Sequence, residues 1–316
     1  MIMPADDPSV AVISDSEISI RLEKGEPEKI HEEFIELLLE GKRPDKLPKF
    51  SRLLRTSVEI PTVNSPEIRP EFLITRSDQT PWVEGRAGMQ YRDLIPGRLG
   101  GAVIASHIRI PNGGPVADYV HYHRVIFQMI YCVSGWARLV YEDQGPPFIM
   151  NAGDCVLQPP GIRHQVLETS PGFEVIEVGC PAIHETWRDH ELTLPTPAIN
   201  SERLFDNQRF HHHIALNAEW RKARPGDLER RDTGLYTASR GIGSASVYRG
   251  PGSGQYESDK DQPLFLHVLA GAIDVEGNGR EFHLEERDSI VFPASGPFTL
   301  TGSDAAEFLS VSIHNG

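Results

Sequence analysis

The chain of 316 residues carries a formal net charge of −14, and 39% of its residues are hydrophobic, with 28 glycines and 25 prolines. This charge disfavours nucleic acid as a partner, because binding to a polyanion requires a basic face. The sequence has no apolar run of about 18 residues and no basic start followed by an apolar core. We therefore expect no membrane span and a cytoplasmic protein.

The N-terminal part precedes the first clear strand pattern. Residues 1 to 25 are polar and acidic without a sustained period, and we expect them to form a mobile arm. The segment 27–42 is predicted to be a helix, because Pro27 suits a first turn and an apolar stripe includes Ile30 and Phe34. This helix is expected to pack against a barrel or a partner subunit.

From about Glu71 onward, short β-rich runs separated by turn residues predict strands. A Pro-rich and polar interval at 181–205 is typical of a connector between two such regions. The two regions share one order of strands and turns, with Gly135 of the first aligned with Gly271 of the second, which indicates two tandem copies of one β-fold. The expected units are an N-terminal arm and helix (1–70), a first β domain (71–195) and a second β domain (196–316).

Three histidines are spaced so that they can meet. The segment HYHRVIFQ contains His121 and His123, and residues i and i+2 of a strand point to one face. A third imidazole, that of His164, follows the tight corner PPG, which suits a strand that returns opposite the first pair. Three imidazoles that meet inside a barrel suit a borderline divalent metal such as iron, manganese, copper, nickel or zinc.

The same residues resemble the two sequence motifs of the cupin superfamily. The first motif, G-x5-H-x-H-x3,4-E-x6-G, corresponds here to His121, His123, Gln128 and Gly135. The second motif, G-x5-P-x-G-x2-H-x3-N, corresponds to Gly153, Pro159, Gly161 and His164. The resemblance implies two tandem cupin jelly-roll barrels with the metal site in the first barrel.

Three positions depart from these motifs. Pro115 stands where the first motif opens with glycine, Glu168 where the second closes with asparagine, and Gln128 where the first has its glutamate ligand. An amide is a weaker ligand than a carboxylate, so we expect Gln128 to be either a weak fourth metal ligand or a hydrogen-bond partner of the ligands. Cupins with three histidines and no acidic ligand resemble iron(II) dioxygenases that cleave diketones or aromatic rings, among them bicupin gentisate-type enzymes.

The second β region lacks such a set of ligands. The positions that match His121, His123, Gln128 and His164 are Glu257, Asp259, Leu264 and Phe298. We therefore expect the metal site of the second barrel to be degenerate. The run His211 to His213 is interpreted as structural, because consecutive side chains on a strand alternate between its two faces.

Residues beside the ligands are candidates for orienting a substrate. We name Gln128, Arg163 and Tyr131 as candidate catalytic residues, with Gln165 as a further neighbour of His164. An arginine could hold a substrate carboxylate by two hydrogen bonds. Because neighbours of a strand ligand point to the opposite face, packing against the sheet or solvent is the competing interpretation for Arg163, Gln165 and Tyr131.

Three functions suit this predicted site. The first is an iron(II) dioxygenase that uses O2 to cleave a small aromatic or dicarbonyl substrate. The second is a non-redox isomerase, epimerase or lyase whose metal acts as a Lewis acid, and the third is a non-catalytic cupin that binds a small molecule. We favour the first, with Fe(II) as cofactor and Mn, Zn, Ni or Cu as alternatives. We also expect a homodimer that binds neither nucleic acid nor membrane.

Overall fold

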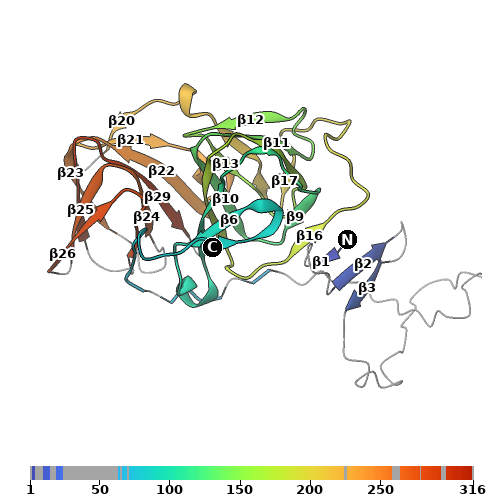
Figure 1. The fold of residues 1–316 in the computed structure, drawn as a ribbon, viewed down its shortest axis with the longest axis horizontal. Helices are drawn as coiled ribbons and strands as arrows, with labels where there is room; N and C mark the ends of the chain where they lie inside the picture. The colour runs from blue at the N-terminus through green and yellow to red at the C-terminus, as the bar shows by residue number, and fades with distance from the viewer. Residues whose placement is uncertain are drawn as a thin grey trace, which may run out of the picture.

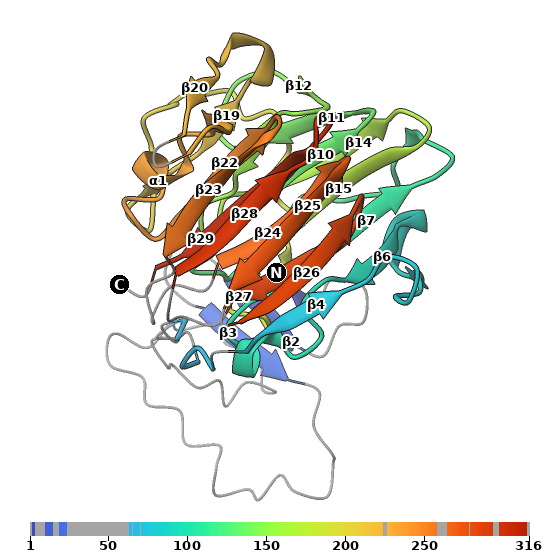
Figure 2. The same cartoon turned by 90° about the vertical axis from the view of Figure 1, so that its left-hand side faces the viewer.

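The computed structural model describes residues 2–3, 10–14, 19–23, 63–64, 66–69, 71–223, 226–257, 264–277, 279–292 and 297–314. Within these residues the chain forms two β-barrels of facing sheets that lie side by side (Figure 1 and Figure 2). The prediction of an all-β protein with two tandem jelly rolls is confirmed. The helix predicted at 27–42 lies outside the described residues. No helix in the described segments is long and apolar enough to cross a membrane.

The first barrel consists of two facing sheets. In spatial order, one sheet contains β12 (Phe148–Asn151), β11 (Trp136–Tyr141), β14 (His164–Thr169), β9 (His121–His123), β16 (Thr186–Arg188), β1 (Ile2–Met3), β2 (Val10–Ser14) and β3 (Ser19–Glu23), with β8 (Gly114–Pro115) paired to β14. The other sheet contains β19 (His211–His213), β13 (Cys155–Leu157), β10 (Phe127–Ser134), β15 (Phe173–Cys180), β7 (Ile104–Ile110), β6 (Gln90–Asp93) and β5 (Val83–Glu84).

The N-terminal segment contributes strands to this barrel. β1 pairs with β16, and β2 and β3 continue the same sheet. The prediction of a mobile arm over residues 1 to 25 is therefore wrong for these strands. β1 obtains backbone hydrogen-bond partners at the sheet edge formed by β16, which lies far along the chain. The local composition of residues 1 to 25 does not reveal such a distant partner.

The second barrel has the same two-sheet plan. One sheet contains β20 (Arg221–Lys222), β21 (Glu229–Asp232), β22 (Gly243–Arg249), β29 (Glu307–Ile313), β24 (Leu264–Ala270), β27 (Ser289–Phe292) and β4 (Leu73–Thr75). The other contains β23 (Gly252–Glu257), β28 (Pro297–Gly302), β25 (Ala272–Gly277) and β26 (Arg280–Glu285). The remaining elements are short: β17 (Leu204–Phe205), β18 (Gln208–Arg209), α1 (Leu235–Ala238), and the 3-10 turns η3 (Arg86–Gly88), η4 (Arg98–Gly101) and η5 (Ala215–Asn217).

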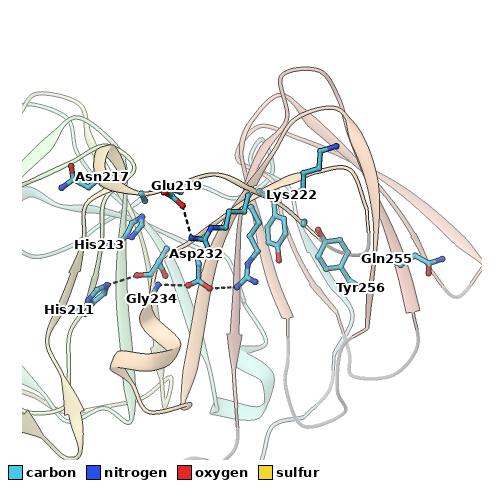
Figure 3. A pocket seen from close by; sticks show the side chains of 15 residues that line it. His211, His213, Asn217, Glu219, Lys222, Asp232, Gly234, Gln255 and Tyr256 are labelled. Atoms are coloured by element: carbon cyan, nitrogen blue, oxygen red, sulfur yellow. Dashed lines mark hydrogen bonds and ion pairs between the residues drawn. The ribbon is translucent and has the colours of Figure 1, made fainter.

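The two barrels exchange strands at equivalent places. β4, which precedes the first barrel in sequence, pairs with β27 of the second barrel, and β19, which precedes the second, pairs with β13 of the first. As a result, sheet membership crosses the domain limit expected at 195/196 in both directions. The β1/β16 pair crosses the limit expected at 70/71. The exchange brings His211 and His213 of β19 beside the second barrel (Figure 3).

The internal repeat predicted from aligned glycines is present in the backbone. Gly135 joins β10 to β11 with a φ of 70°, and Gly271 joins β24 to β25 with a φ of 66°. A Cβ at Gly271 would lie 2.6 Å from the backbone of Ala305, so only glycine fits there without a shift of the chain. Each preceding strand also has a register shift just before its glycine, after Cys132 in β10 and after Val268 in β24.

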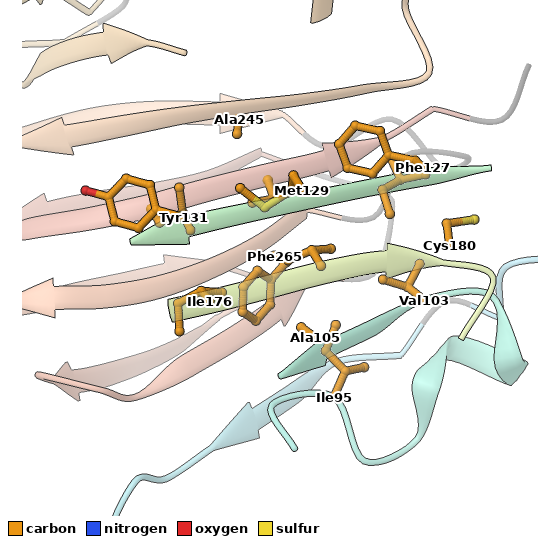
Figure 4. Packing of buried hydrophobic residues seen from close by; sticks show 14 of the residues in the cluster. Ile95, Val103, Ala105, Phe127, Met129, Tyr131, Ile176, Cys180, Ala245 and Phe265 are labelled. Atoms are coloured by element: carbon orange, nitrogen blue, oxygen red, sulfur yellow. The ribbon is translucent and has the colours of Figure 1, made fainter. Parts of the chain in front are cut away.

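A shared hydrophobic cluster joins the barrels. β10 alternates, with Phe127, Met129 and Tyr131 directed at the second barrel, where they pack in a cluster that includes Ala245 and Phe265 (Figure 4). The opposite face of β10 belongs to the interior of the first barrel. This alternation decides which residues of β10 can approach the site described next.

Candidate metal centre

The three predicted ligand histidines lie together inside the first barrel. His121 and His123 are the ends of the short strand β9, and His164 opens β14 directly opposite His121 in the sheet. One ring nitrogen from each histidine lies within 4.8 Å of the other two. The ring centroids are 4.3 Å apart for His121 and His164, and 5.1 Å apart for His121 and His123. Two strands and one tight corner thus assemble the cluster, as the sequence spacing predicted.

Each imidazole is held through its Nδ1 atom. The Nδ1 of His121 lies 2.7 Å from the carbonyl oxygen of Tyr119, and that of His164 lies 3.0 Å from the carbonyl oxygen of Ile162. A carbonyl only accepts, so both Nδ1 atoms carry the proton and donate it, and both Nε2 atoms keep a lone pair. The Nδ1 of His123 lies 2.9 Å from the hydroxyl of Thr186. Such contacts fix the ring and the tautomer of a metal-binding histidine.

The three histidines are neutral. Burial and, to a smaller extent, the nearby positive charge of Arg86 together lower the pKa of His121 to about 3. Burial also lowers the pKa of His123 and His164 well below the usual value, with a further contribution from the neighbouring imidazoles. Neutral imidazole is the form that binds a metal ion, so the cluster needs no proton release at neutral pH.

Gln128 reaches the histidines through a second glutamine. Its Oε1 accepts a hydrogen bond of 3.0 Å from the Nε2 of Gln158, and the same Nε2 lies 3.1 Å from the Nε2 of His164. The Nε2 of Gln128 itself donates to the carboxylate of Glu177 at 3.1 Å. Of the two roles left open by the sequence, this arrangement favours hydrogen bonding over direct ligation. Gln158 was missed, because it occupies a variable position of the second motif.

Arg86 is the second residue that the sequence did not reveal. It lies in η3, and its Nη2 atom is 3.0 Å from the Nε2 of His121, while its Nη1 atom is 3.5 Å from the carboxylate of Asp118. The adjacent Ala87 has a φ of 54°, so this turn adopts a backbone conformation that is uncommon outside glycine. Although burial alone would lower the pKa of Arg86, Asp118 and two tyrosines raise it, and the guanidinium stays charged.

The histidines line one part of a small and mainly apolar cavity of about 80 Å³. Its apolar lining includes Met89, Ile108, Ile110, Leu139, Met150, Val166, Phe173 and Val175. The polar lining includes Tyr91, Tyr141, Gln158, Gln165 and Glu177. Arg86 is the one cation among these residues, so a bound molecule would meet one positive side chain and a largely apolar wall.

None of the three predicted catalytic residues lines this cavity: Gln128 contacts the lining residue Gln158, and Tyr131 and Arg163 point away. Tyr131 lies between the barrels, where its hydroxyl accepts a hydrogen bond of 3.4 Å from Arg231. Arg163 packs over the ring of Tyr122 at 4.5 Å and pairs with Asp189 at 3.2 Å. Neighbouring residues of a strand point to opposite faces, and each of these two residues stands next to one that faces the cavity. Both therefore point away from it, as the competing interpretation held. Gln165 does line the cavity.

In the second barrel, two of the four corresponding positions are described with their side chains, and both hold apolar residues, Leu264 and Phe298. Phe298 stands opposite Tyr256 in the β23/β28 pair, which is equivalent to the β9/β14 pair that brings His164 opposite His121 in the first barrel. The Phe298 ring stacks on Phe292 with centroids 4.0 Å apart. Asp259 lies outside the described residues. Across the described part of the chain, the three histidines are the single group of three or more metal-ligating side chains.

Comparisons with known proteins agree with this architecture. Residues 106–176, which include the three histidines, match the family model of the cupin domain. The structure of oxalate decarboxylase from Bacillus subtilis at pH 4.6 superposes with a TM-score of 0.56 and 15% sequence identity, over 80% of this chain and 77% of that chain. A second structure of that enzyme, solved in a study of its Mn(II) centres, gives a TM-score of 0.56 and 14% identity over 80% of this chain and 78% of that chain. No curated protein sequence matches the chain.

These findings identify the fold. The chain has the two-barrel jelly-roll fold of the bicupin structures that it resembles, and residues 106–176 match the cupin-domain model. The histidine cluster lies in this segment, in the interior of the first barrel.

Proposed function

We propose that the first barrel binds Fe(II) through the Nε2 atoms of His121, His123 and His164, and that the protein is a dioxygenase for a small aromatic or dicarbonyl substrate. The observation that carries this proposal is three neutral imidazoles, each held through Nδ1, at one wall of an apolar cavity. A donor set of neutral nitrogen atoms suits iron as well as manganese, nickel, copper and zinc. Bound iron would supply a site for a substrate oxygen atom and the electrons for reaction with O2.

The ligand set fits a metal ion with one adjustment. The guanidinium of Arg86 donates toward the lone pair of His121 Nε2 that a metal would use. Metal binding therefore requires Arg86 to turn away, and repulsion between two cations favours the same movement. Asp118 lies within 3.5 Å of both Arg86 and His121, so it can hold the turned guanidinium beside the site.

Arg86 is the group that would bind the acidic oxygen of the substrate. A guanidinium in a partly apolar cavity forms strong hydrogen bonds to carboxylate, enolate or phenolate oxygen. The apolar wall would take the remainder of the substrate and exclude water from it. Gln158 would keep the ring of His164 in place from the side of Gln128.

The lining also argues against a small dianion as substrate. The structural neighbours act on oxalate, which has two carboxylates and no apolar part. Here the lining holds one cation, Arg86, one carboxylate, Glu177, and a wall of aliphatic and aromatic side chains, which such a substrate would leave uncontacted. The cavity supports a substrate with one acidic group and an apolar body.

The decisive experiment is metal analysis of anaerobically purified protein, followed by O2 uptake over a panel of phenolic acids and 1,3-diketones. We expect one iron per chain and uptake that depends on the substrate. The variant Arg86→Gln should raise KM about tenfold or more for acidic substrates and leave a neutral ester analogue unchanged. Protein that retains no iron, or that turns over without O2, would reject the dioxygenase.

A non-redox reaction is the second candidate, and one observation favours it. The structural neighbours include an enzyme with Mn(II) centres, and three imidazoles would also hold manganese. In this case the metal would act as a Lewis acid in an isomerase or lyase. Manganese-loaded protein assayed under anaerobic conditions distinguishes the two, because only the non-redox enzyme turns over there.

A further inference from the structure

A second, larger cleft lies away from the histidine cluster. It has a volume of about 1000 Å³ and shares no lining residue with the metal cavity. One wall is β19, which the first barrel borrows, and the floor and other wall are β20 to β23 of the second barrel (Figure 3). The exchange of strands between the barrels thus creates a site that neither barrel forms alone.

The floor of this cleft collects positive charge. Arg221 of β20 stands directly opposite Arg230 of β21, and Arg230 stands directly opposite Tyr248 of β22. Side chains at such positions share one face of the sheet, and like charges there repel. Lys222 also lines the cleft, and no hydrogen bond or ion pair of its side chain occurs within the described residues.

Two carboxylates balance part of this charge. Glu219 pairs with Arg221 at 3.0 Å, and Asp232 pairs with Arg230 at 2.9 Å. The lining therefore holds three cations and two anions, an excess of one positive charge. The whole chain carries a formal charge of −14, so this local excess is opposite in sign to the molecule. An excess of one positive charge matches a ligand with one negative charge better than it matches a doubly charged phosphate.

Two buried polar atoms in the lining lack a hydrogen-bond partner. They are the Nε2 of His213, whose side chain is only 7% exposed, and the hydroxyl of Tyr256. Figure 3 shows His213 on the wall formed by β19 and the Tyr256 hydroxyl directed toward the cleft from the opposite side. A buried polar group without a partner costs free energy, which a ligand that reaches it would recover.

An apolar surface adjoins these polar groups. The rings of Tyr248 and Tyr256 meet edge to face, with centroids 5.5 Å apart, at the mouth of the second barrel. The Tyr248 ring stacks on Phe308 and the Tyr256 ring on Phe298, so the parts of these two rings that line the cleft are the surface offered to a planar ring. From the charge excess, the unpartnered polar atoms and the aromatic pair together, we infer that this cleft is a second binding site, which takes an organic monocarboxylate with a planar apolar body.

Benzoate is a suitable probe, and the experiment must separate the cleft from the metal cavity. In metal-free protein, the variant Arg86→Gln leaves no cation at the metal cavity, so benzoate that still binds is assigned to the cleft. In that background, calorimetry on the full-length protein should find one benzoate per chain. Benzamide, which keeps the ring and lacks the charge, should bind about tenfold more weakly.

Substitutions then locate the bound benzoate. Added to Arg86→Gln, either Arg230→Gln or Tyr256→Phe should weaken benzoate binding about tenfold. Tyr256→Phe removes a hydroxyl that has no partner, so the ligand-free protein should unfold at no lower temperature. Arg249→Gln is the matched control, because Arg249 pairs with Glu229 and stacks on Trp220 without lining the cleft, and it should leave the affinity unchanged.

Several results would overturn the inference. Loss of all benzoate binding in Arg86→Gln would assign the ligand to the metal cavity. Equal affinity for benzoate and benzamide would show that the charge is not recognised. Tighter binding of inorganic phosphate than of benzoate at equal ionic strength would reject the monocarboxylate. None of these outcomes depends on metal binding or catalysis in the first barrel.

Discussion

The two barrels use the same strand order and the same glycine-linked bulge, yet their interiors differ. In the first, the β9/β14 pair brings His121 and His164 together at the wall of a cavity. In the second, the equivalent β23/β28 pair brings Tyr256 and Phe298 together, and Phe298 stacks closely on Phe292. One jelly roll keeps its interior partly open and polar, and the other fills the same place with aromatic rings. The fold thus permits a site without requiring one.

Of the proposed substitutions, removal of one ligand histidine should have the largest effect on the difference between the two barrels. We expect His164→Ala to lose the metal. Removal of a residue that hydrogen-bonds to a ligand typically lowers metal affinity roughly 10- to 100-fold, and removal of the ligand itself should lower it more. Metal analysis after dialysis measures the loss. His283→Ala is a suitable control, since His283 lies exposed on β26 of the second barrel. Unchanged metal content in His164→Ala would rule out the proposed ligand set.

The matching change in the second barrel should act on stability alone. Phe298 is 5% exposed and lies in the aromatic cluster, so Phe298→Ala should lower the free energy of unfolding by about 3–5 kcal/mol. Chemical denaturation measures this change. The metal content per chain should stay the same. A loss of metal at unchanged stability would mean that the second barrel takes part in the metal site.

A third substitution tests the role of residue 128, the position where the cupin motif has glutamate. Gln128→Glu would set a carboxylate against Glu177, which now accepts a hydrogen bond from the amide. We expect a loss of about 1–3 kcal/mol in the free energy of unfolding and no gain in metal affinity. Denaturation and metal titration test both parts. A clear gain in affinity would instead identify residue 128 as a direct ligand.

The predictable part of this site follows from local rules. The two-residue period of a strand placed His121 and His123 on one face, and the PPG corner returned the chain so that His164 stands opposite them. The repeat was visible because a tight turn with positive φ needs glycine at Gly135 and Gly271 alike.

The unpredicted part depends on contacts between distant segments. Arg86 precedes His121 by 35 positions and reaches it from a 3-10 turn that no periodic pattern marks. The exchanged strands β4 and β19 have three residues each, too few to show which barrel they join. Strand parity directed Tyr131 and Arg163 away from the cavity, and the sequence-based choice of these residues gave that parity too little weight.

The smallest effect concerns pH and the contact between the barrels. His107 of the first barrel and His267 of the second are fully buried there, with ring centroids 5.6 Å apart. Burial lowers the pKa of both, and for His267 the charges of Arg92 and Arg287 lower it further, although Glu174 opposes this shift at His107. The folded protein therefore holds both rings neutral.

The sign of the pH dependence follows from these lowered values. Below about pH 6.5 the unfolded chain binds protons at these histidines that the folded chain does not, so stability should be constant above neutrality and fall as the pH drops. His267→Gln cannot be protonated and should reduce the slope by about 1.4 kcal/mol per pH unit, measured by denaturation between roughly pH 6 and 4. Identical slopes for the two proteins would show that His267 takes up its proton while the barrels remain in contact. The remaining acid sensitivity of the barrel contact would then come from His107 and not from His267.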